Sequence, residues 1–253
     1  MMTAKRSSEG RGPGQTKRII SRAVFFSAAV LAFMGLAAIP TRAQRMTPED
    51  DRQKARFEAV SRAVEKRGYA GAIVVGSSGG TTPDLFALLA TRNGKGVLIA
   101  AVEPAGTEPV LPAELESDQT PVDLGIAGVR FGPFLGTDDL IEAVVSHHPF
   151  RLETTMMFDR HFVLRRSGNS LTVVGDFEGD STSTTAKGYR TVAAKRTGSV
   201  EKVAGASPLQ FDLKTVQITT EQSGQGPAVV LERSENVKRY VLSASGRFTP
   251  LNK

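Results

Sequence analysis

The sequence predicts an α+β protein, in which a small α/β N-terminal part precedes an antiparallel β-rich part built as a sandwich or a barrel. Two observations support this fold class. Before residue 150, two segments begin with helix-start patterns and lie beside short apolar runs. From residue 150 onward, short runs with β-branched and aromatic residues alternate with turn clusters of Gly, Ser and Pro, which is typical of antiparallel strands.

Residues 1–43 have the pattern of a secretory signal peptide. Six basic residues and one acidic residue precede position 23, and the charge-free segment 23–39 follows. Thr41 and Ala43 then give a small-x-small exit, so we expect export by the Sec route, cleavage after Ala43 and a periplasmic or extracellular mature protein. The alternative is a retained signal anchor, because 17 apolar residues lie at the low end of what spans a bilayer.

The composition excludes several kinds of site. The chain has no cysteine, which rules out disulfides, thiolate metal ligands and a cysteine nucleophile. Residues 1–43 hold seven basic residues and one acidic residue, so residues 44–253 hold 25 of each and are formally neutral. The net charge of +6 therefore gives no support for nucleic-acid binding. We expect an envelope or extracellular partner, with no transmembrane segment in the mature chain, and no pattern identifies a cofactor.

The first element that we expect after the signal peptide is a helix over residues 48–67. Thr47 is a capping hydroxyl, Pro48 suits the first helical position, and acidic residues follow that favour the helix N-terminus. Gly68 ends the segment. One face of this helix is apolar at helical spacing, through Phe57, Val60 and Val64.

Residues 72–102 predict a strand–helix–strand unit, which together with the first helix forms a part spanning residues 44–102. We expect strands over 72–75 and 97–102. Thr82 and Pro83 resemble a second helix start, and the Leu- and Ala-rich residues 85–91 favour a helix between the strands. The alternative is a β-hairpin that turns on Asn93 and Gly94, a dipeptide typical of tight hairpins.

Two connecting segments precede the β-rich part. Residues 103–122 contain four prolines and five acidic residues, which predicts a linker or a long surface loop. Residues 123–149 predict a short helical connection, because Thr137 and the two aspartates after it cap the segment LIEAVVSH ahead of Pro149. The β-rich part then spans residues 150–253.

All three histidines of the chain lie within 15 residues, at His147, His148 and His161. Alternation along a strand places Asp159 and His161 on the same face, about 6.6 Å apart. If the other two histidines fold back onto this strand, the four side chains suit a non-haem metal site or an acid–base pair. The competing interpretation is that the two residues on the strand are solvated, and that His147 lies in the last turn of a helix, where the helix dipole favours a cation.

Ser78 is a second candidate, as a catalytic nucleophile. Residues 76–80 read GSSGG and fit the G-x-S-x-G pattern, between an expected strand and an expected helix. Against it, few residues precede the serine to build the strands of an α/β-hydrolase. The alternative is a flexible Gly/Ser turn.

Two further patterns point to weaker binding sites. Residues 176–182 alternate oxygen-bearing side chains in an expected turn, which suits a Ca²⁺ site or a polar hairpin end. Pairs of basic residues recur at the ends of the expected strands, where they either bind anionic surfaces or keep strand edges soluble.

No complete catalytic set is present in the sequence. We therefore expect an exported binding or envelope-associated module. The alternative is a secreted hydrolase that uses the His/Asp cluster with a metal, or Ser78.

Overall fold

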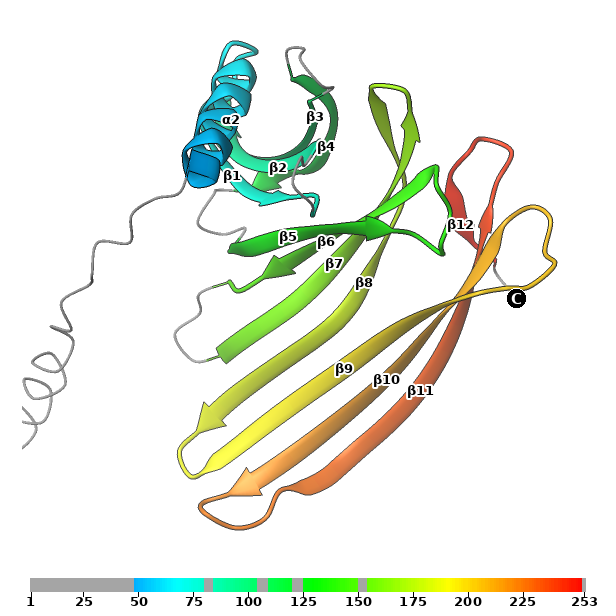
Figure 1. Ribbon diagram of the computed structural model, residues 1–253. Helices are drawn as coiled ribbons and strands as arrows, with labels where there is room; N and C mark the ends of the chain where they lie inside the picture. Colours follow the sequence, from blue (N-terminus) through cyan, green and yellow to red (C-terminus); the bar gives the residue numbers. More distant parts are fainter. Residues whose placement is uncertain (1–47, 80–83, 104–108, 120–124, 150–153, 252–253) are drawn as a thin grey trace, which may run out of the picture. The chain divides into compact units, whose positions relative to one another are not determined.

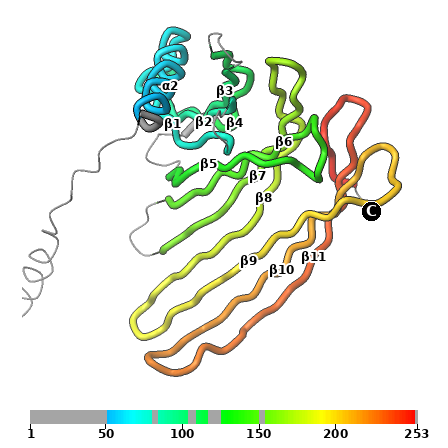
Figure 2. The backbone as a smooth tube through the Cα atoms, viewed as in Figure 1, coloured from blue at the N-terminus to red at the C-terminus, as the bar shows by residue number. Residues whose placement is uncertain are grey.

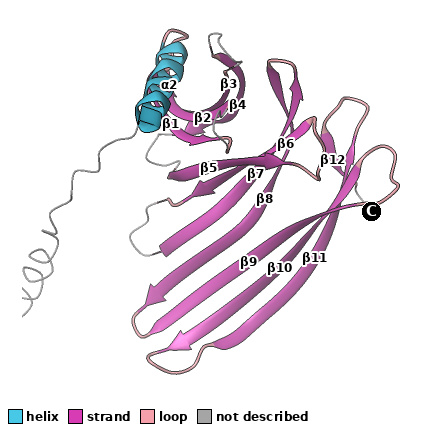
Figure 3. Cartoon of the chain, viewed as in Figure 1, coloured by secondary structure: helices cyan, strands magenta, loops and turns pink. Residues whose placement is uncertain are grey.

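The computed structural model describes residues 48–79, 84–103, 109–119, 125–149 and 154–251. Within these ranges the protein is mostly antiparallel β-sheet, with one helix and twelve strands in two sheets (Figures 1 and 3). The chain divides into two compact units, residues 1–51 and 52–253. The description below concerns the second unit. The predicted β-rich character is confirmed, and the signal peptide lies outside the described residues.

The four-stranded sheet is an antiparallel meander. Its strands are β1 (Ala70–Ser77), β2 (Leu85–Arg92), β3 (Lys95–Val102) and β4 (Val110–Gln119), paired in that order. Helix α2 (Pro48–Glu65) precedes them and matches the predicted helix except for its last two residues. The helix buries Val60 and Val64 completely, in a cluster with Phe86 and Leu88 of β2. The narrow apolar stripe of the helix is thus the face that packs on the sheet.

The predicted helix over residues 85–91 is wrong, and the alternative hairpin is correct. Asn93 and Gly94 have φ angles of 54° and 77° and close a tight turn between β2 and β3. Strand β2 contains no alternation of polar residues because both of its faces are buried. Phe86 and Leu88 face the helix, whereas Leu85 and Ala87 belong to the core that the two sheets share.

Residues 110–119 form strand β4, although the proline and acidic content predicts a linker or loop there. Leu115 is buried in the core between the sheets, and β4 pairs with β3 through an interrupted register. Two of its acidic side chains have ionic partners, since Glu114 pairs with Arg92 and Glu116 with Arg160. The pairing of these charges explains how an acidic segment is accommodated in a sheet.

The eight-stranded sheet is also a meander, visible as successive hairpins in Figure 2. Every strand pairs antiparallel with its neighbours in chain order. The strands are β5 (Ile126–Pro133), β6 (Leu140–His147), β7 (Thr154–Ser167), β8 (Ser170–Lys187), β9 (Arg190–Lys202), β10 (Gln210–Ser223), β11 (Val229–Leu242) and β12 (Phe248–Pro250).

The predicted helix over LIEAVVSH is wrong, because these residues form β6. The segment pairs with β5 on one side and β7 on the other. Ala143, Val145 and His147 are buried at every second position, the period of a strand. Thr137 does not cap a helix; its hydroxyl donates a hydrogen bond of 2.8 Å to the carbonyl of Phe134 in the turn after β5.

Two apolar clusters use opposite faces of the eight-stranded sheet. Phe162 and Val145 contribute to the core between the sheets, which gives the sandwich-like part of the fold. The next residue along β7, Val163, belongs to a second cluster that is rich in aromatic side chains. In this cluster Phe211 and Tyr240 stack with ring centroids 4.9 Å apart.

The far halves of β9, β10 and β11 have no buried side chain. In β10 only Phe211 and Leu213, near its start, are buried, and residues 229–239 of β11 are all exposed. These strands therefore form a single layer that is open to solvent on both faces within the described residues. Separately, none of the described helical residues form a helix that is long and apolar enough to cross a membrane.

Candidate functional site

The histidine stretch folds into two neighbouring strands instead of one cluster. His147 ends β6, and Asp159 and His161 lie on β7, which pairs with β6 in a regular register. In that register His147 is opposite Phe158, and Val144 is opposite His161. The two histidines are thus an odd number of residues apart on both strands, which places them on opposite faces of the sheet.

His147 lies on the face toward the four-stranded sheet and is buried in a polar cluster. Its ring stacks on Phe158, with centroids 4.5 Å apart. Its Nε2 is 3.4 Å from Oε1 of Glu116 on β4, beyond ordinary hydrogen-bond length. Both side chains are less than 10% exposed. Because His147 lies in a strand, the expectation that a helix dipole favours its cationic form is wrong.

Arg160 connects this buried cluster to the sheet surface. Its two terminal nitrogens contact Glu116 at 3.1 Å and Asp176 at 2.9 Å. The guanidinium lies 5.0 Å from the ring centre of Phe162. Burial alone would lower the pKa of Arg160, but its hydrogen bonds to Asp176 and Glu116 and their charges raise the pKa above its usual value. The group is therefore a permanent cation that links three strands from both sheets.

His161 forms a carboxylate–imidazole pair on the opposite face. Its Nδ1 is 2.7 Å from Oε1 of Glu142 on β6. The ring stacks on Phe177 of β8, with centroids 4.8 Å apart and planes at 16°. A Cβ atom at Gly179 would collide with Nε2, so this glycine leaves the space that the imidazole occupies. The pair could transfer protons, but its second ring nitrogen points at the backbone of β8.

Asp159 and His148 have other surroundings. The Asp159 carboxylate accepts a hydrogen bond of 2.7 Å from the Ser146 hydroxyl, and Arg130 lies 3.7 Å away. His148 is exposed just after β6, and its backbone N–H donates to the carbonyl of Gly125. Asp159 and His161 do share one face, as strand alternation predicts, because no register shift separates them in the pairing with β6.

The described residues do not bring together a set of metal ligands. Among them, no group of three or more His, Cys, Asp or Glu side chains could hold a metal ion. His147 faces Glu116, His161 faces Glu142, and the sheet separates the two pairs. The predicted metal site of His147, His148, Asp159 and His161 thus gains no support from this geometry.

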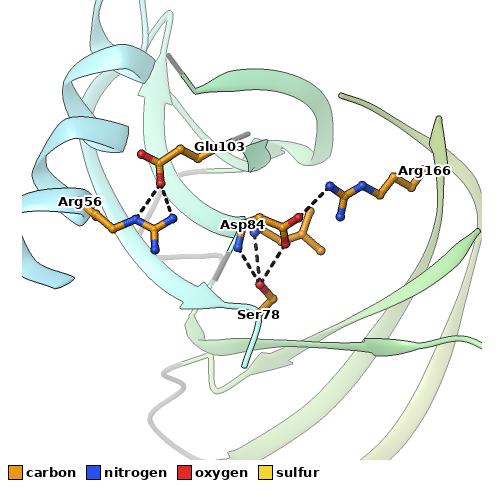
Figure 4. Close-up of polar contacts among 6 residues, drawn as sticks. Arg56, Ser78, Asp84, Glu103 and Arg166 are labelled. Carbon is orange, nitrogen blue, oxygen red and sulfur yellow. Dashed lines mark hydrogen bonds and ion pairs between the residues drawn. The ribbon is translucent and has the colours of Figure 1, made fainter. Parts of the chain in front are cut away.

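Ser78 directly follows β1, and its hydroxyl links the end of this strand to the start of β2 (Figure 4). Its hydroxyl oxygen accepts hydrogen bonds of 3.2 Å from the N–H groups of Asp84 and Leu85. The Asp84 carboxylate in turn binds Arg166 of β7 at 2.7 Å. A strand follows the loop, where a nucleophile elbow needs a helix. The hydrogen bonds described for the hydroxyl include none to a histidine.

The expected turn over residues 176–182 lies inside strand β8. Its acidic side chains have protein partners. Glu178 binds Arg196 at 2.5 Å, and the Asp180 carboxylate accepts a hydrogen bond of 2.8 Å from the N–H of Gly198. Because the segment is extended and its carboxylates are engaged, it does not form a cation-binding loop.

Two hollows lie on the described surface. One, of about 330 Å³, opens on the long strands and is mostly polar, lined by Glu178, Arg196, Leu213, Thr215, Asn236, Lys238 and Tyr240. The other, of about 490 Å³, is mostly apolar and lies between α2 and β1. Neither hollow was predicted from the sequence, because each is formed by the packing of several elements: strands β8 to β11 line the first, and α2 and the next element, β1, line the second.

The chain matches no family model, no curated protein and no solved structure. Functional inference therefore depends on the residues and geometry described above.

Proposed function

We propose that this protein is an exported, non-catalytic binding module, which engages an envelope or extracellular partner through the outer halves of strands β9 to β11. The observation that supports this most directly is the single-layer sheet. A stable sheet ordinarily buries at least one face against another layer. Residues 229–239 of β11 are instead all exposed, and both Val229 and Val237 keep more than half of their surface in solvent.

Two of the candidate catalytic residues also support a binding role. Ser78 joins the end of β1 to the start of β2, and the Asp159 carboxylate accepts a hydrogen bond from Ser146. Each of these contacts is explained by packing or by the satisfaction of a polar group. The expected export of the chain places the exposed sheet in the envelope or outside the cell.

The proposal can be tested by hydrogen exchange on the mature protein, residues 44–253. Soluble and membrane fractions of a bacterial envelope are added separately, and exchange is followed by mass spectrometry. We expect one fraction to slow exchange in β9 to β11 while β2 and β3 stay unchanged. Unchanged exchange in β9 to β11 with both fractions would contradict the proposal.

A hydrolase is the second candidate, supported by the 2.7 Å contact between Glu142 and His161. If the pair acts as a general base, the purified protein hydrolyses a generic ester and His161→Ala abolishes that activity. A fluorophosphonate tests Ser78 in the same preparation, and elemental analysis tests for a bound metal. Absence of hydrolysis, labelling and stoichiometric metal would reject this candidate.

A further inference from the structure

Strand β11 is the outermost long strand of the eight-stranded sheet, and most of its outer edge is unpaired (Figure 2). Its inner edge pairs with β10, whereas its outer edge pairs with β12 only through residues 240–242. The N–H of Leu251 also donates a hydrogen bond of 2.8 Å to the carbonyl of Arg239. Within the described part of the chain, no strand pairs with the outer edge of residues 229–238. A free edge of this length is a template for another strand.

Every second residue of β11 directs its backbone groups at this free edge. In an antiparallel sheet the N–H and C=O of one residue point to the same side, and successive residues alternate. The carbonyl of Arg239 points outward, since its hydrogen bond lies on the outer edge. Pairing with β10 is regular over residues 232–241. The backbone groups of Arg233, Glu235 and Val237 therefore point outward as well.

The polar side chains of this edge are arranged symmetrically about Ser234. Arg233 and Glu235 lie on either side of it, on one face of the sheet, with their charged groups 2.8 Å apart and both side chains more than 60% exposed. Glu232 and Asn236 lie one residue further out, on the opposite face. On each face, the side chain before Ser234 is thus complementary to the side chain after it.

A second copy of the chain satisfies this pattern when it pairs antiparallel with β11. The two-fold axis of such a pair is perpendicular to the sheet and runs between one residue and its own copy. With the axis at Ser234, Arg233 faces Glu235 of the second copy, and Glu232 faces Asn236, each of them twice. With the axis at Arg233 or at Glu235, that charged residue faces its own copy, which is unfavourable.

The register centred on Ser234 also fits the length of the free edge. It pairs residues 230–238 of each copy, so the second strand ends next to Arg239, whose carbonyl already has a partner. The pairing of β11 with β10 shifts at Leu231, which places this irregularity at the two ends of the contact and leaves its centre regular. A two-fold contact uses the same edge of both copies, so it closes at a dimer.

We propose that two copies of this protein associate through the outer edges of their β11 strands, antiparallel and with the two-fold axis at Ser234. Arg233 and Glu235 exchange backbone hydrogen bonds and ion pairs between the copies. The strand edge supplies fewer than the roughly 20–30 residues per side of a standard interface, so the dimer dissociates on dilution. This inference goes beyond the proposed function and does not depend on export. Edge pairing leaves both faces of β10 open to another partner.

The absence of cysteine allows a direct test, because Ser234→Cys introduces the sole thiol of the chain at the proposed axis. Ser234 directs its backbone groups at β10, so it forms a non-hydrogen-bonded pair with its copy. The Cα atoms of such a pair are about 4.5 Å apart, a distance that a disulfide spans. We expect mild oxidation of the purified variant to give a covalent dimer on a non-reducing gel. Circular dichroism checks that the variant keeps the β-rich fold.

Lys238→Cys is the matched control, because Lys238 is also exposed and lies on the same face of β11 as Ser234. In the proposed register it faces residue 230 of the second copy, so the two introduced thiols are about 26 Å apart. We expect this variant to cross-link about tenfold or more slowly than Ser234→Cys.

Charge reversal tests the register independently. Arg233→Glu and Glu235→Arg should each weaken dimerisation about tenfold in sedimentation equilibrium, because each places like charges opposite each other twice. The double variant should dimerise as the unaltered protein does, and a mixture of the two single variants should form a mixed dimer, since both restore opposite charges. Arg190→Glu is the control, because it reverses an exposed charge beside Glu221 and away from the β11 edge. It should leave dimerisation unchanged.

Three results would overturn the proposal. The first is an unaltered protein that stays monomeric at every concentration in sedimentation equilibrium, and the second is equal cross-linking of the Ser234→Cys and Lys238→Cys variants. The third is a double charge variant that dimerises as weakly as the single ones. If the protein stays monomeric but an envelope fraction still slows exchange in β9 to β11, the binding function stands and only the dimer is wrong.

Discussion

The hydroxyl of Tyr69 links strands β2 and β4 of the four-stranded sheet. Tyr69 follows α2 closely and is 9% exposed. Its hydroxyl donates to Glu114 of β4 at 2.5 Å and accepts from Arg92 of β2 at 3.1 Å. Burial, the hydrogen bond to Glu114 and the charge of Glu114 raise the pKa of Tyr69 above its usual value of 10.0, against the opposing effect of Arg92.

The raised pKa of Tyr69 predicts a loss of stability in alkali. As pH rises past 10, the phenol ionises in the unfolded chain before it ionises in the folded chain. Stability therefore falls as pH rises from the unfolded pKa toward the folded pKa. Tyr69→Phe should cost roughly 1 kcal/mol at pH 7, through the lost hydrogen bond. This cost should shrink above pH 10, as measured by urea unfolding of both proteins across pH.

Tyr189→Phe is the control for this prediction, because it removes a phenol at an exposed turn. It should leave the free energy of unfolding unchanged at each pH. A cost of Tyr69→Phe that is the same at pH 7 and above pH 10 would contradict the assigned role of the phenol.

Strand alternation correctly predicted that two candidate side chains share one face of the sheet. The glutamates that lie beside the candidate histidines were not predicted. Asp159 and His161 lie on one face because the period of a strand is fixed by its backbone. No pattern in the sequence marked Glu142 and Glu116 as neighbours of the histidines. They come from other strands, distant in the sequence, and no local pattern records which charges a fold will bring together.

At the scale of elements, β2 shows why a buried strand resembles a helix. Its sequence LFALLATR consists mostly of good helix formers and lacks polar alternation. Both faces are buried, so the periodicity that distinguishes a strand is absent. Only the Asn93-Gly94 dipeptide indicated a β-hairpin at this place, since turn geometry depends on local backbone preferences.

The close approach of β1 and β5 predicts a large effect of a single methyl group. A Cβ atom at Gly76 would collide with the backbone oxygen of Val129. Because the obstruction is backbone, a side-chain rotation cannot relieve it. Gly76→Ala should therefore destabilise the protein by about 1–3 kcal/mol in urea unfolding.

Gly132→Ala provides a matched strand control. It lies on β5, and a Cβ atom there would meet nothing within 4 Å. We expect its effect to stay within about 0.5 kcal/mol. Similar losses for both variants would mean that β1 and β5 are not packed as closely as the structure indicates.

At the scale of the described molecule, stability should be unevenly distributed. Strands β2 and β3 are buried on both faces, whereas the far half of β10 has hydrogen-bonded neighbours on both sides but no buried side chain. Hydrogen bonds alone contribute little net stability, and burial supplies most of the free energy that resists local opening. Strands β2 and β3 and the far half of β10 are thus hydrogen-bonded in a similar way, but only β2 and β3 are also stabilised by buried side chains.

Native-state hydrogen exchange of the free mature protein can measure this difference. Amides of residues 215–222 in β10 should exchange about tenfold or more faster than those of residues 86–90 in β2, corrected for intrinsic rates. Equal protection would mean that the long strands are covered in solution, for example by self-association, which a dilution series would reveal. Faster exchange in β10 alone would identify the outer sheet as the part of the fold that remains to be stabilised by a partner.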